Sequence, residues 1–328
     1  YLQMQQLNQK MFRATSANNW IDEVKDLPTP KMLFSEFWVE NEICILFADT
    51  NVGKTILAVQ IANSISKGIP IEGFKMEAEK QKVIYFDFEL SAKQFQLRYT
   101  CEDCSYENKY YQFDENFIRA EIDQDYEYAF GKDKVDAIIK QVEICALEND
   151  AKIIVIDNIT YINDDVETAK FAAPLMKSLK TLKKTYGYSI LVVAHTPKRD
   201  LSKALSINDL AGSKQLANFT DSCFAINKSS REEELRYIKQ LKVRFSGLLY
   251  GTDNIVECNI VKKSNILEFE YKGFGLEQAH LKERTLEEKE QRLIEAKSYK
   301  DNGWTNVKIA NHFNVSEGAV RKWFNKAA

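Results

Sequence analysis

The sequence predicts an α/β fold, in which a mainly parallel sheet is flanked by helices and a small all-α unit follows. Two observations predict it. Between about residues 43 and 227, short runs of β-branched and aromatic residues alternate with longer amphipathic stretches. The runs are almost continuously apolar, which is typical of parallel strands that helices cover on both faces. Their sequences are ICILFA, KVIYFDF, AKIIVID and SILVVAH.

The stretches between these runs have the periodicity of helices. DKVDAIIKQVEICALEN and TAKFAAPLMKSLKTLKKTYG repeat apolar residues at helical spacing, and the second ends at Gly187, a typical C-cap. From residue 235 to 274 no long helical pattern occurs, and antiparallel strands that extend the sheet are expected there. Near residue 284 a charged helix is predicted to begin, with Thr285 and Glu288 in capping-box spacing.

Three regions follow from these patterns. They are an N-terminal segment at 1–30 that could dock on a neighbouring subunit or simply fray, an α/β domain at 31–283, and a helical domain at 284–328.

Composition predicts a globular, cytosolic chain. The 328 residues are 45% hydrophobic and 28% charged, which suffices for a sizeable core and a soluble surface. No apolar run approaches the roughly 18 residues of a membrane helix, and the first twenty residues lack the apolar core of a secretory signal. The net charge of −3 argues against nucleic-acid binding over the whole surface, so any DNA contact is expected to be local.

The six cysteines are expected to be reduced, because a chain of this size needs no disulfide framework. Cys101 and Cys104 have the spacing of metal ligands. A zinc site needs four ligands, however, and no second pair or nearby histidine completes one. A structural thiol pair is the favoured interpretation.

The segment FADTNVGKTILAV, residues 47–59, carries the strongest functional motif. Gly53, Lys54 and Thr55 match the end of the pattern G-x-x-x-x-G-K-[ST], between a predicted strand and a predicted helix. Backbone amides at such a helix start surround phosphate oxygens, while Lys54 reaches the β- and γ-phosphates and the Thr55 hydroxyl binds Mg²⁺. ATP and Mg²⁺ are therefore the expected ligands. The predicted nucleotide-binding residues are Ala48, Asp49, Thr50, Asn51, Val52, Gly53, Lys54 and Thr55.

The first glycine of this pattern is missing. Ala48 stands in its place, and Asn51 occupies a mid-loop position where a second glycine is frequent. Alanine fits if its φ stays negative, and asparagine is the non-glycine residue that best tolerates the left-handed region.

Carboxylates at the ends of two other strands fit the same chemistry. Asp157 ends the run IIVID, where it can hold the magnesium ion together with Thr55. Glu89 lies just beyond another strand and can deprotonate the attacking water, with Asp87 as the fallback base. A solvated turn carboxylate is the alternative for Glu89.

The order of these motifs over about residues 30–275 resembles the RecA-like ATPases, and within them the hexameric replicative helicases of the DnaB and plasmid RepA kind. The resemblance implies that His195, in VVAHTPKR, senses the γ-phosphate and passes its state to the following loop. It also implies that Lys242 and Arg244, in KVRFSG, act on the ATP of the neighbouring subunit. A cation delivered across an interface stabilises the transition state; a solvated basic pair is the alternative.

The loop after His195 is polar and partly basic. In RecA-like motors the matching loop lines a central channel and contacts single-stranded DNA. The candidate contacts here are Lys198, Arg199, Lys203 and Lys214. Few aromatic residues are present for base stacking, so a plain surface loop is nearly as well supported.

The segment TNVKIANHFNVSEGAVRKWFNK resembles a helix-turn-helix. Its apolar spacing allows two short helices to pack across a turn, with Ser316 as the cap of the second. The residues expected to face a major groove are Glu317, Gly318, Arg321, Lys322 and Asn325. Small helical units also serve as protein-docking modules, but the local positive charge favours duplex DNA.

Two functions fit these predictions. One is an ATP-driven motor that moves along or unwinds DNA in the replication or transfer of a plasmid or mobile element. This motor is expected to be a homo-oligomer that forms a hexameric ring. The other is a DNA-bound ATPase switch that assembles at a duplex site without unwinding it. A small-molecule kinase is less well supported, because no acceptor site or lid is recognisable.

Overall fold

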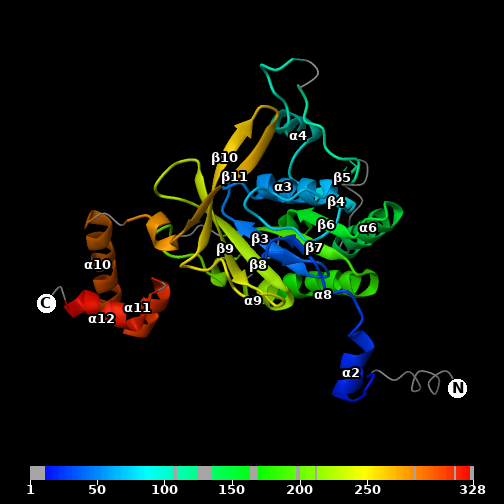
Figure 1. Cartoon of the computed structure of the whole chain (residues 1–328). Coiled ribbons are helices and arrows are strands. Elements are labelled where there is room, and N and C mark those ends of the chain that lie inside the picture. Colours follow the sequence, from blue (N-terminus) through cyan, green and yellow to red (C-terminus); the bar gives the residue numbers. More distant parts are fainter. Residues whose placement is uncertain are drawn as a thin grey trace.

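The computed structural model describes residues 12–105, 109–123, 134–162, 169–196, 200–210, 213–283, 286–313 and 315–325. Within these ranges, nine strands form one sheet in the order β11-β10-β9-β8-β3-β7-β6-β4-β5 (Figure 1). The strands are β3 (Ile43–Ala48), β4 (Val83–Asp87), β5 (Phe117–Ala120), β6 (Ile153–Asp157), β7 (Ser189–His195), β8 (Ser222–Lys228), β9 (Leu235–Lys242), β10 (Ile255–Lys263) and β11 (Ile266–Gly275).

The predicted fold class is confirmed. Strands β8, β3, β7, β6, β4 and β5 run parallel, and β9, β10 and β11 extend the sheet by antiparallel pairing. The four apolar runs of the sequence are β3, β4, β6 and β7. Strands β5 and β8 were not singled out from the sequence, because β5 is short and only half-buried and β8 includes polar residues.

Helices cover both faces of the parallel strands. The described helices of the domain are α3 (Lys54–Lys67), α4 (Ala92–Arg98), α6 (Lys134–Glu148), α7 (Ile159–Ile162), α8 (Ala169–Tyr186) and α9 (Ser213–Phe219). On β3, Ile45 and Phe47 pack into the core under α6 and α8, whereas Cys44 and Leu46 pack into the core under α3. This alternation with burial on both sides explains why β3 reads as a continuous apolar run. The second helical segment predicted from the sequence is α8, and Gly187 follows it with φ 69°.

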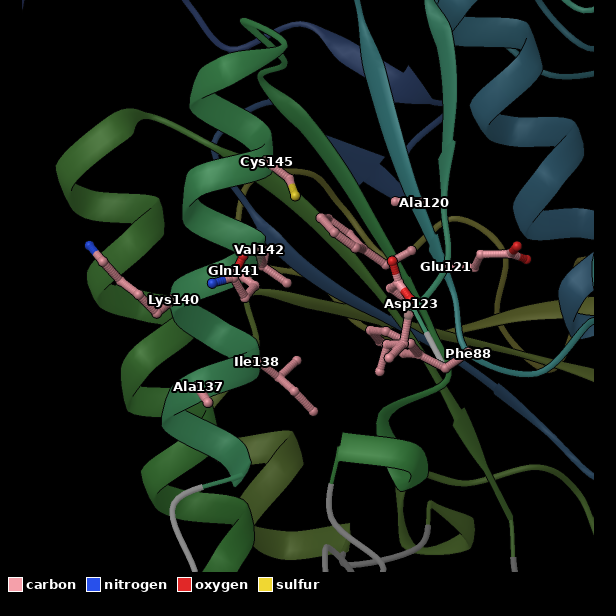
Figure 2. A pocket seen from close by; sticks show the side chains of 12 residues that line it. Phe88, Ala120, Glu121, Asp123, Ala137, Ile138, Lys140, Gln141, Val142 and Cys145 are labelled. Carbon is pink, nitrogen blue, oxygen red and sulfur yellow. The ribbon is translucent and has the colours of Figure 1, made fainter. Parts of the chain in front are cut away.

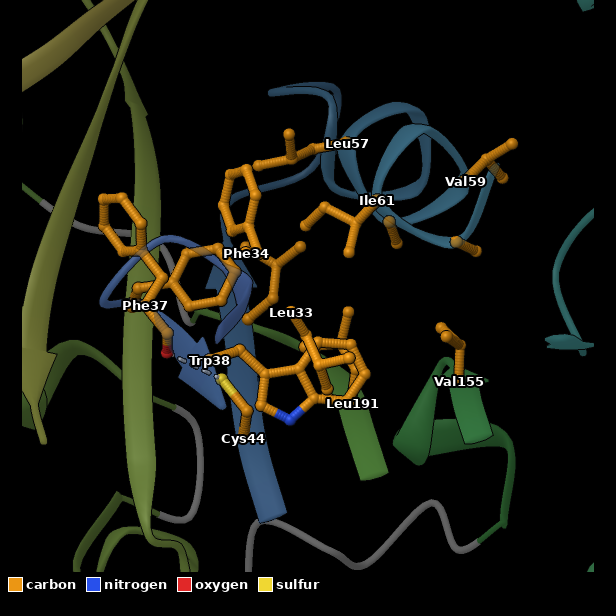
Figure 3. Close-up of a cluster of buried hydrophobic side chains, with 14 of the residues drawn as sticks. Leu33, Phe34, Phe37, Trp38, Cys44, Leu57, Val59, Ile61, Val155 and Leu191 are labelled. Atoms are coloured by element: carbon orange, nitrogen blue, oxygen red, sulfur yellow. Dashed lines mark hydrogen bonds between the residues drawn. The ribbon is translucent and has the colours of Figure 1, made fainter. Parts of the chain in front are cut away.

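The core under α3 is shared with a small hairpin, formed by β1 (Met32–Phe34) and β2 (Trp38–Val39). Figure 3 shows Phe34, Phe37 and Trp38 of this hairpin region packed near Leu57 and Ile61 of α3. These large buried side chains fix α3, whose first residue is Lys54, against the end of β3.

The hairpin of β10 and β11 packs against α3 and is hydrogen-bonded to it. The Gln60 side chain donates from Nε2 to the Phe269 carbonyl at 3.0 Å and accepts from the Phe269 amide at 2.8 Å. At Gly53, which has φ 110°, a Cβ would lie 2.8 Å from Ile260 Cδ1 and 2.9 Å from Phe269 Cζ. Both its backbone conformation and this packing therefore require glycine.

Three helices form the C-terminal unit: α10 (Leu286–Asp301), α11 (Asn306–His312) and α12 (Glu317–Asn325). They surround a small core, as the apolar spacing predicts. Its fully buried members are Ala296, Ile309, Ala310, Phe313 and Val320. The expected cap at Ser316 is present, since its hydroxyl accepts from the Ala319 amide at 3.2 Å. The predicted capping residue Thr285 lies outside the described residues.

The cysteine prediction is wrong for one pair. Cys101 and Cys104 form a disulfide in the loop after α4, whereas Cys44, Cys145, Cys223 and Cys258 are free. The close spacing of the pair, in a turn that brings the two residues together, permits the bond without any framework of further disulfides.

At the N-terminal end, α2 (Ala17–Val24) projects from the domain (Figure 1). None of its residues is buried, and Ile21 and Val24 are more than half exposed. Among the described helices, none is long and apolar enough to cross a membrane. The β1 strand begins at Met32 and α10 at Leu286, close to the predicted boundaries of the three regions.

Candidate functional site

The predicted site residues of four strands lie at one edge of the sheet. β3 and β7 pair with Ala48 opposite His195, and β4 and β6 pair with Asp87 opposite Asp157. β3 lies between β7 and β8, so the chain leaves it in one direction and later returns to its other side. In parallel sheets, ligands bind at the carboxyl ends of the strands beside such a switch point.

The loop between β3 and α3 has the conformation that the missing glycine required. Ala48 is fully buried in β3 and is not among the described residues with positive φ, while Asn51 has φ 60°. Gly53 precedes the first turn of α3. The first amides of a helix have no partners within it, so this loop offers a set of N–H donors to an anion.

Lys54 lies inside this loop. Its ammonium donates to the carbonyls of Ala48 at 3.0 Å and Asp49 at 2.8 Å, and the residue is only 5% exposed. Burial lowers the pKa of Lys54, and the carboxylates of Glu89, Asp157 and Asp49 oppose this effect. A buried cation held only by carbonyls gains from an incoming anion.

Asp157 is fully buried at the end of β6. Its Oδ2 accepts from the Tyr85 hydroxyl at 2.6 Å, whereas its Oδ1 has no hydrogen-bond partner in the described part of the chain. Burial raises the pKa of Asp157 to about 6, and the hydroxyls of Tyr85 and Thr55 partly oppose this rise. An unpartnered buried carboxylate oxygen beside a threonine hydroxyl matches the donors that Mg²⁺ prefers.

Asn158 connects two of the predicted catalytic residues. Its Nδ2 donates to Glu89 Oε2 at 3.1 Å and lies 2.9 Å from His195 Nε2. Its Oδ1 accepts from the Thr160 amide at 3.1 Å, which fixes the orientation of the side chain. His195 therefore accepts at Nε2 and is neutral, and burial together with the charge of Lys54 lowers its pKa in the same direction.

Comparison with known proteins gives a family for this chain. The family described as AAA domain matches residues 9–200, which is more than half of the chain. The chain belongs to the AAA domain family. A solved structure similar to this chain is that of a KaiC-like protein from Pyrococcus horikoshii OT3, with 15% identity and a TM-score of 0.45 over 71% of this chain and 90% of that chain. No curated protein matches the chain.

The core of the chain is thus an AAA domain. Proteins of this class typically use ATP and Mg²⁺. The residues present fit both ligands, because the loop from Ala48 to Thr55 offers amide donors and Lys54, and Asp157 offers a buried oxygen without a partner. Thr55 and Asp157 would hold the metal ion.

Asp87, the fallback base, has a structural role in this AAA domain. Its Oδ2 accepts from Arg119 Nε at 2.9 Å, and its Oδ1 accepts from the amides of Glu89 at 3.2 Å and Leu90 at 2.8 Å. Both oxygens are engaged, and the residue is buried. Asp87 thereby positions the turn that carries Glu89, which remains the candidate base.

Two arginines near the loop were missed in the sequence. Arg98, from α4, lines a pocket of about 220 Å³ together with Lys54, Glu89 and His195. Its Nη1 is buried without a hydrogen-bond partner in the described chain, so it is available to a ligand anion. Arg236, on β9, donates from Nε to the Val52 carbonyl at 3.2 Å and supports the loop from behind. The sequence did not indicate them, because both arginines are far from residues 48–55 along the chain and only the folding of the sheet and its hairpin brings them close to the loop.

A larger cavity, of about 490 Å³, lies between α6 and the ends of β4 and β5 (Figure 2). Phe88, Ile138 and Cys145 make its wall mainly apolar, and Glu121 and Asp123 lie at its edge. These carboxylates would repel a triphosphate. The smaller pocket at Lys54 therefore fits a triphosphate better than this cavity does.

Lys242 and Arg244 lie at the opposite edge of the sheet. β9 ends with Lys242 paired to Cys223, at the start of β8. The Lys242 ammonium donates to the carbonyls of Ala217 and Thr220, both at 2.6 Å, so it is engaged within its own chain. Arg244 makes an ion pair with Asp221 at 3.2 Å, but its side chain is 52% exposed. Neither side chain can reach the pocket of its own AAA domain.

Of the predicted channel-loop residues, Lys198 and Arg199 lie outside the described residues, and so does the side chain of Lys214. The Lys203 ammonium donates to the Phe313 carbonyl of the C-terminal unit. On α12 the predicted groove-facing residues lie at the surface, where Arg321 and Lys322 are exposed and Arg321 pairs with Glu317 at 2.8 Å. Gly318 and Asn325 are exposed as well.

Replacing Asp157 and replacing Asp87 with asparagine should have opposite effects on the free energy of unfolding. In metal-free buffer at pH 7.5, Asp157→Asn should raise the free energy of unfolding by about 2 to 3 kcal/mol, because the native pKa of about 6 exceeds the ordinary value of 3.8 and ionisation therefore opposes folding. The gain should shrink as the pH falls through 6 and vanish below about 4, where both states are protonated. Urea unfolding followed by circular dichroism, at pH 7.5 and at a pH of about 4, measures the free energy of unfolding of both proteins.

The matched control is Asp87→Asn, on the adjacent strand. It leaves Arg119 without its buried partner and should lower the free energy of unfolding by about 3 kcal/mol. A loss of stability in both variants would show that the Asp157 carboxylate is not strained in the native state.

Proposed function

We propose that this chain is a DNA-binding ATPase that hydrolyses ATP with Mg²⁺ and acts as a homo-oligomer. The observation that supports hydrolysis is the convergence of phosphate-binding, metal-binding and base residues at one pocket. They are Lys54, Thr55, Glu89, Asp157 and His195.

Each of these residues has a distinct role. The loop amides and the Lys54 ammonium would bind the β- and γ-phosphates, and Thr55 and Asp157 would hold a metal ion that supplies positive charge beside the phosphate oxygens. Glu89 takes the proton of the attacking water, and its carboxylate is held in place by the Asn158 amide. His195 shares that amide and so responds to the same site.

The position of Arg244 supports catalysis between subunits. It lies at the sheet edge opposite the pocket, half-exposed, beside Lys242. In a closed ring of identical subunits, one edge of each subunit faces the other edge of the next, so Arg244 would enter the neighbour's pocket. The exposed apolar side of α2 would dock on the adjacent protomer and hold the ring, for which six subunits are proposed by the resemblance to hexameric ATPases.

The C-terminal unit supports a DNA-binding role. It has the three-helix form in which a second short helix enters a major groove, and α12 exposes Arg321 and Lys322 on its outer face. One form of this function is a motor for replication or mobilisation of a plasmid or mobile element, with single-stranded DNA in a channel. The other is a switch on duplex DNA, which the bond from Lys203 to Phe313 favours, because it uses a channel-loop cation inside the chain.

Lys54→Ala tests the nucleotide site. The variant should lose at least about 100-fold in the rate of ATP hydrolysis, because a pre-oriented cation at the phosphates is removed, while circular dichroism and melting stay near those of the wild type. The control is Lys67→Ala, at the far end of the same helix, which should keep wild-type turnover. Equal turnover in Lys54→Ala and Lys67→Ala would exclude the assigned pocket.

Mixing two inactive variants tests catalysis between subunits. Arg244→Ala should bind ATP but hydrolyse it about 1000-fold more slowly, and Glu89→Ala should also be inactive. Random mixing at equal concentration places an intact Glu89 opposite an intact Arg244 at about one quarter of the interfaces, so part of the activity should return.

The control for this mixture is Glu89→Ala with Lys54→Ala. Both substitutions lie in the pocket, so every pocket in this mixture carries one of them and no interface contains an intact pocket. This pair should stay inactive. If the Arg244→Ala mixture is as inactive as the control, Arg244 does not act in trans.

Duplex binding by α12 is tested with matched double variants. Arg321→Ala/Lys322→Ala should weaken binding to duplex DNA about tenfold or more and leave single-strand binding nearly unchanged. Lys297→Ala/Lys300→Ala, on α10, removes the same charge from the same unit and should change duplex binding less than about twofold. Fluorescence anisotropy at fixed salt measures both. Equal losses in the two double variants would reduce the effect to net charge.

A further inference from the structure

The disulfide between Cys101 and Cys104 closes a short loop that begins soon after α4. Cys101 is only 9% exposed, whereas Cys104 is half-buried and its Sγ lies 3.2 Å from the hydroxyl oxygen of Ser264. Ser264 is in the turn between β10 and β11. The disulfide therefore links the chain that follows α4 to the tip of this hairpin, and Cys104 is the more exposed of the two cysteines.

A second contact joins the end of α4 to the same hairpin (Figure 1). The Lys262 ammonium, on β10, donates to the carbonyl of Arg98 and, at 3.5 Å, to that of Leu97. Arg98 lines the pocket at Lys54, and its Nη1 is buried without a hydrogen-bond partner among the residues that the structure describes. The position of the Arg98 guanidinium in the pocket therefore depends on how the end of α4 is held against β10.

The hairpin borders the same pocket. Ile260, on β10, lines it together with Gly53 and Lys54. Ile260 and Phe269 also leave no room for a side chain at Gly53. The disulfide and Lys262 thus connect two walls of the pocket, one from α4 and one from β10. Such a connection restricts the relative movement of the two walls, so a ligand loses less free energy in ordering them when it binds.

Backbone contacts hold Cys101 in place without the disulfide. Its amide donates to the Lys109 carbonyl at 2.7 Å, and the Tyr111 amide donates to the Tyr99 carbonyl at 3.0 Å. Tyr99 itself is only 4% exposed. None of these contacts involves a sulfur atom, so they persist when the disulfide is opened. Opening it therefore separates Cys104 from a fixed Cys101 and removes the covalent part of the link between α4 and the hairpin.

We propose that Cys101 and Cys104 are a site of reversible redox modification, and that reduction of their disulfide by a dithiol weakens ATP binding because Arg98 is held less firmly in the pocket. The effect on ATP binding rests on the proposed ATP site.

The exchange begins at the more exposed sulfur. A thiolate of the dithiol attacks Cys104 Sγ, a mixed disulfide forms, and Cys101 Sγ leaves as a thiolate that takes up a proton. The second thiol of the dithiol then displaces Cys104 and closes the disulfide of the reagent. The protein gains two electrons and two protons, and the dithiol loses the same number of each.

The test compares the oxidised wild type with the wild type reduced by dithiothreitol, after the reagent has been removed under nitrogen. Titration of thiols in denaturant should count four before reduction and six after it. Calorimetric titration with a non-hydrolysable ATP analogue should give a dissociation constant about threefold or more higher for the reduced protein, because the pocket is less pre-organised. Reoxidation should restore the lower value.

Three variants locate the effect. Cys104→Ser should bind the analogue as weakly as the reduced wild type, with or without dithiothreitol treatment. Arg98→Ala should bind it equally in both redox states, because the group through which the disulfide acts is absent. The matched control is Cys145→Ser, which removes a free cysteine on α6 and should keep the full wild-type difference.

Four results would overturn the redox site: six thiols counted before reduction, equal and measurable binding by the two forms of the wild type, a response of Cys104→Ser to dithiothreitol, or a full wild-type difference in Arg98→Ala. Each of them leaves the proposed ATP site in place. If neither form of the wild type binds the analogue, although the thiol count rises from four to six, the ATP site fails and its redox control fails with it.

Discussion

The structure depends on an electrostatic imbalance at the carboxyl edge of the parallel strands. Asp157 is buried with one oxygen unpartnered, while the Lys54 ammonium is turned back onto the carbonyls of its own loop. A domain selected for stability alone would avoid both groups, because each is removed from water without a matching partner. A metal ion would supply the partner for the Asp157 oxygen and a phosphate would supply it for the Lys54 ammonium, so binding of both ligands would recover the cost of burying these groups.

The loop keeps its shape without the leading glycine because its constraints come from other places. Ala48 is still part of β3, where an extended backbone suits any residue. The demanding conformation falls at Gly53, where the hairpin of β10 and β11 leaves no room for a side chain. Arg236 fixes the loop from the other side through the Val52 carbonyl. Elements that follow the motif by about 200 residues of chain therefore determine how the motif folds.

Local patterns predicted the strands, the phosphate loop, Asp157 and the three-helix unit, because each depends on residues close in sequence. The connections between them could not be predicted in the same way. Asn158 reaches Glu89 across 69 positions, Arg236 reaches Val52 across 184, and Lys203 reaches Phe313 across 110. Asn158 alone had a sequence signal, since it directly follows the strand-terminal Asp157. Asp87 was only the fallback base, and its ion pair with Arg119 of the edge strand β5 could not be predicted from the sequence.

The contact of Lys203 also limits how a motor and a switch could coexist in one subunit. While its ammonium is bonded to the Phe313 carbonyl, the Lys203 side chain is held against the C-terminal unit. Single-stranded DNA would have to displace the C-terminal unit from the loop, and duplex DNA on α12 would leave that contact in place. The two kinds of DNA would then favour different positions of the Lys203 side chain. If the chain binds DNA as proposed, the contact of Lys203 with Phe313 would therefore be retained with duplex DNA and lost with single-stranded DNA.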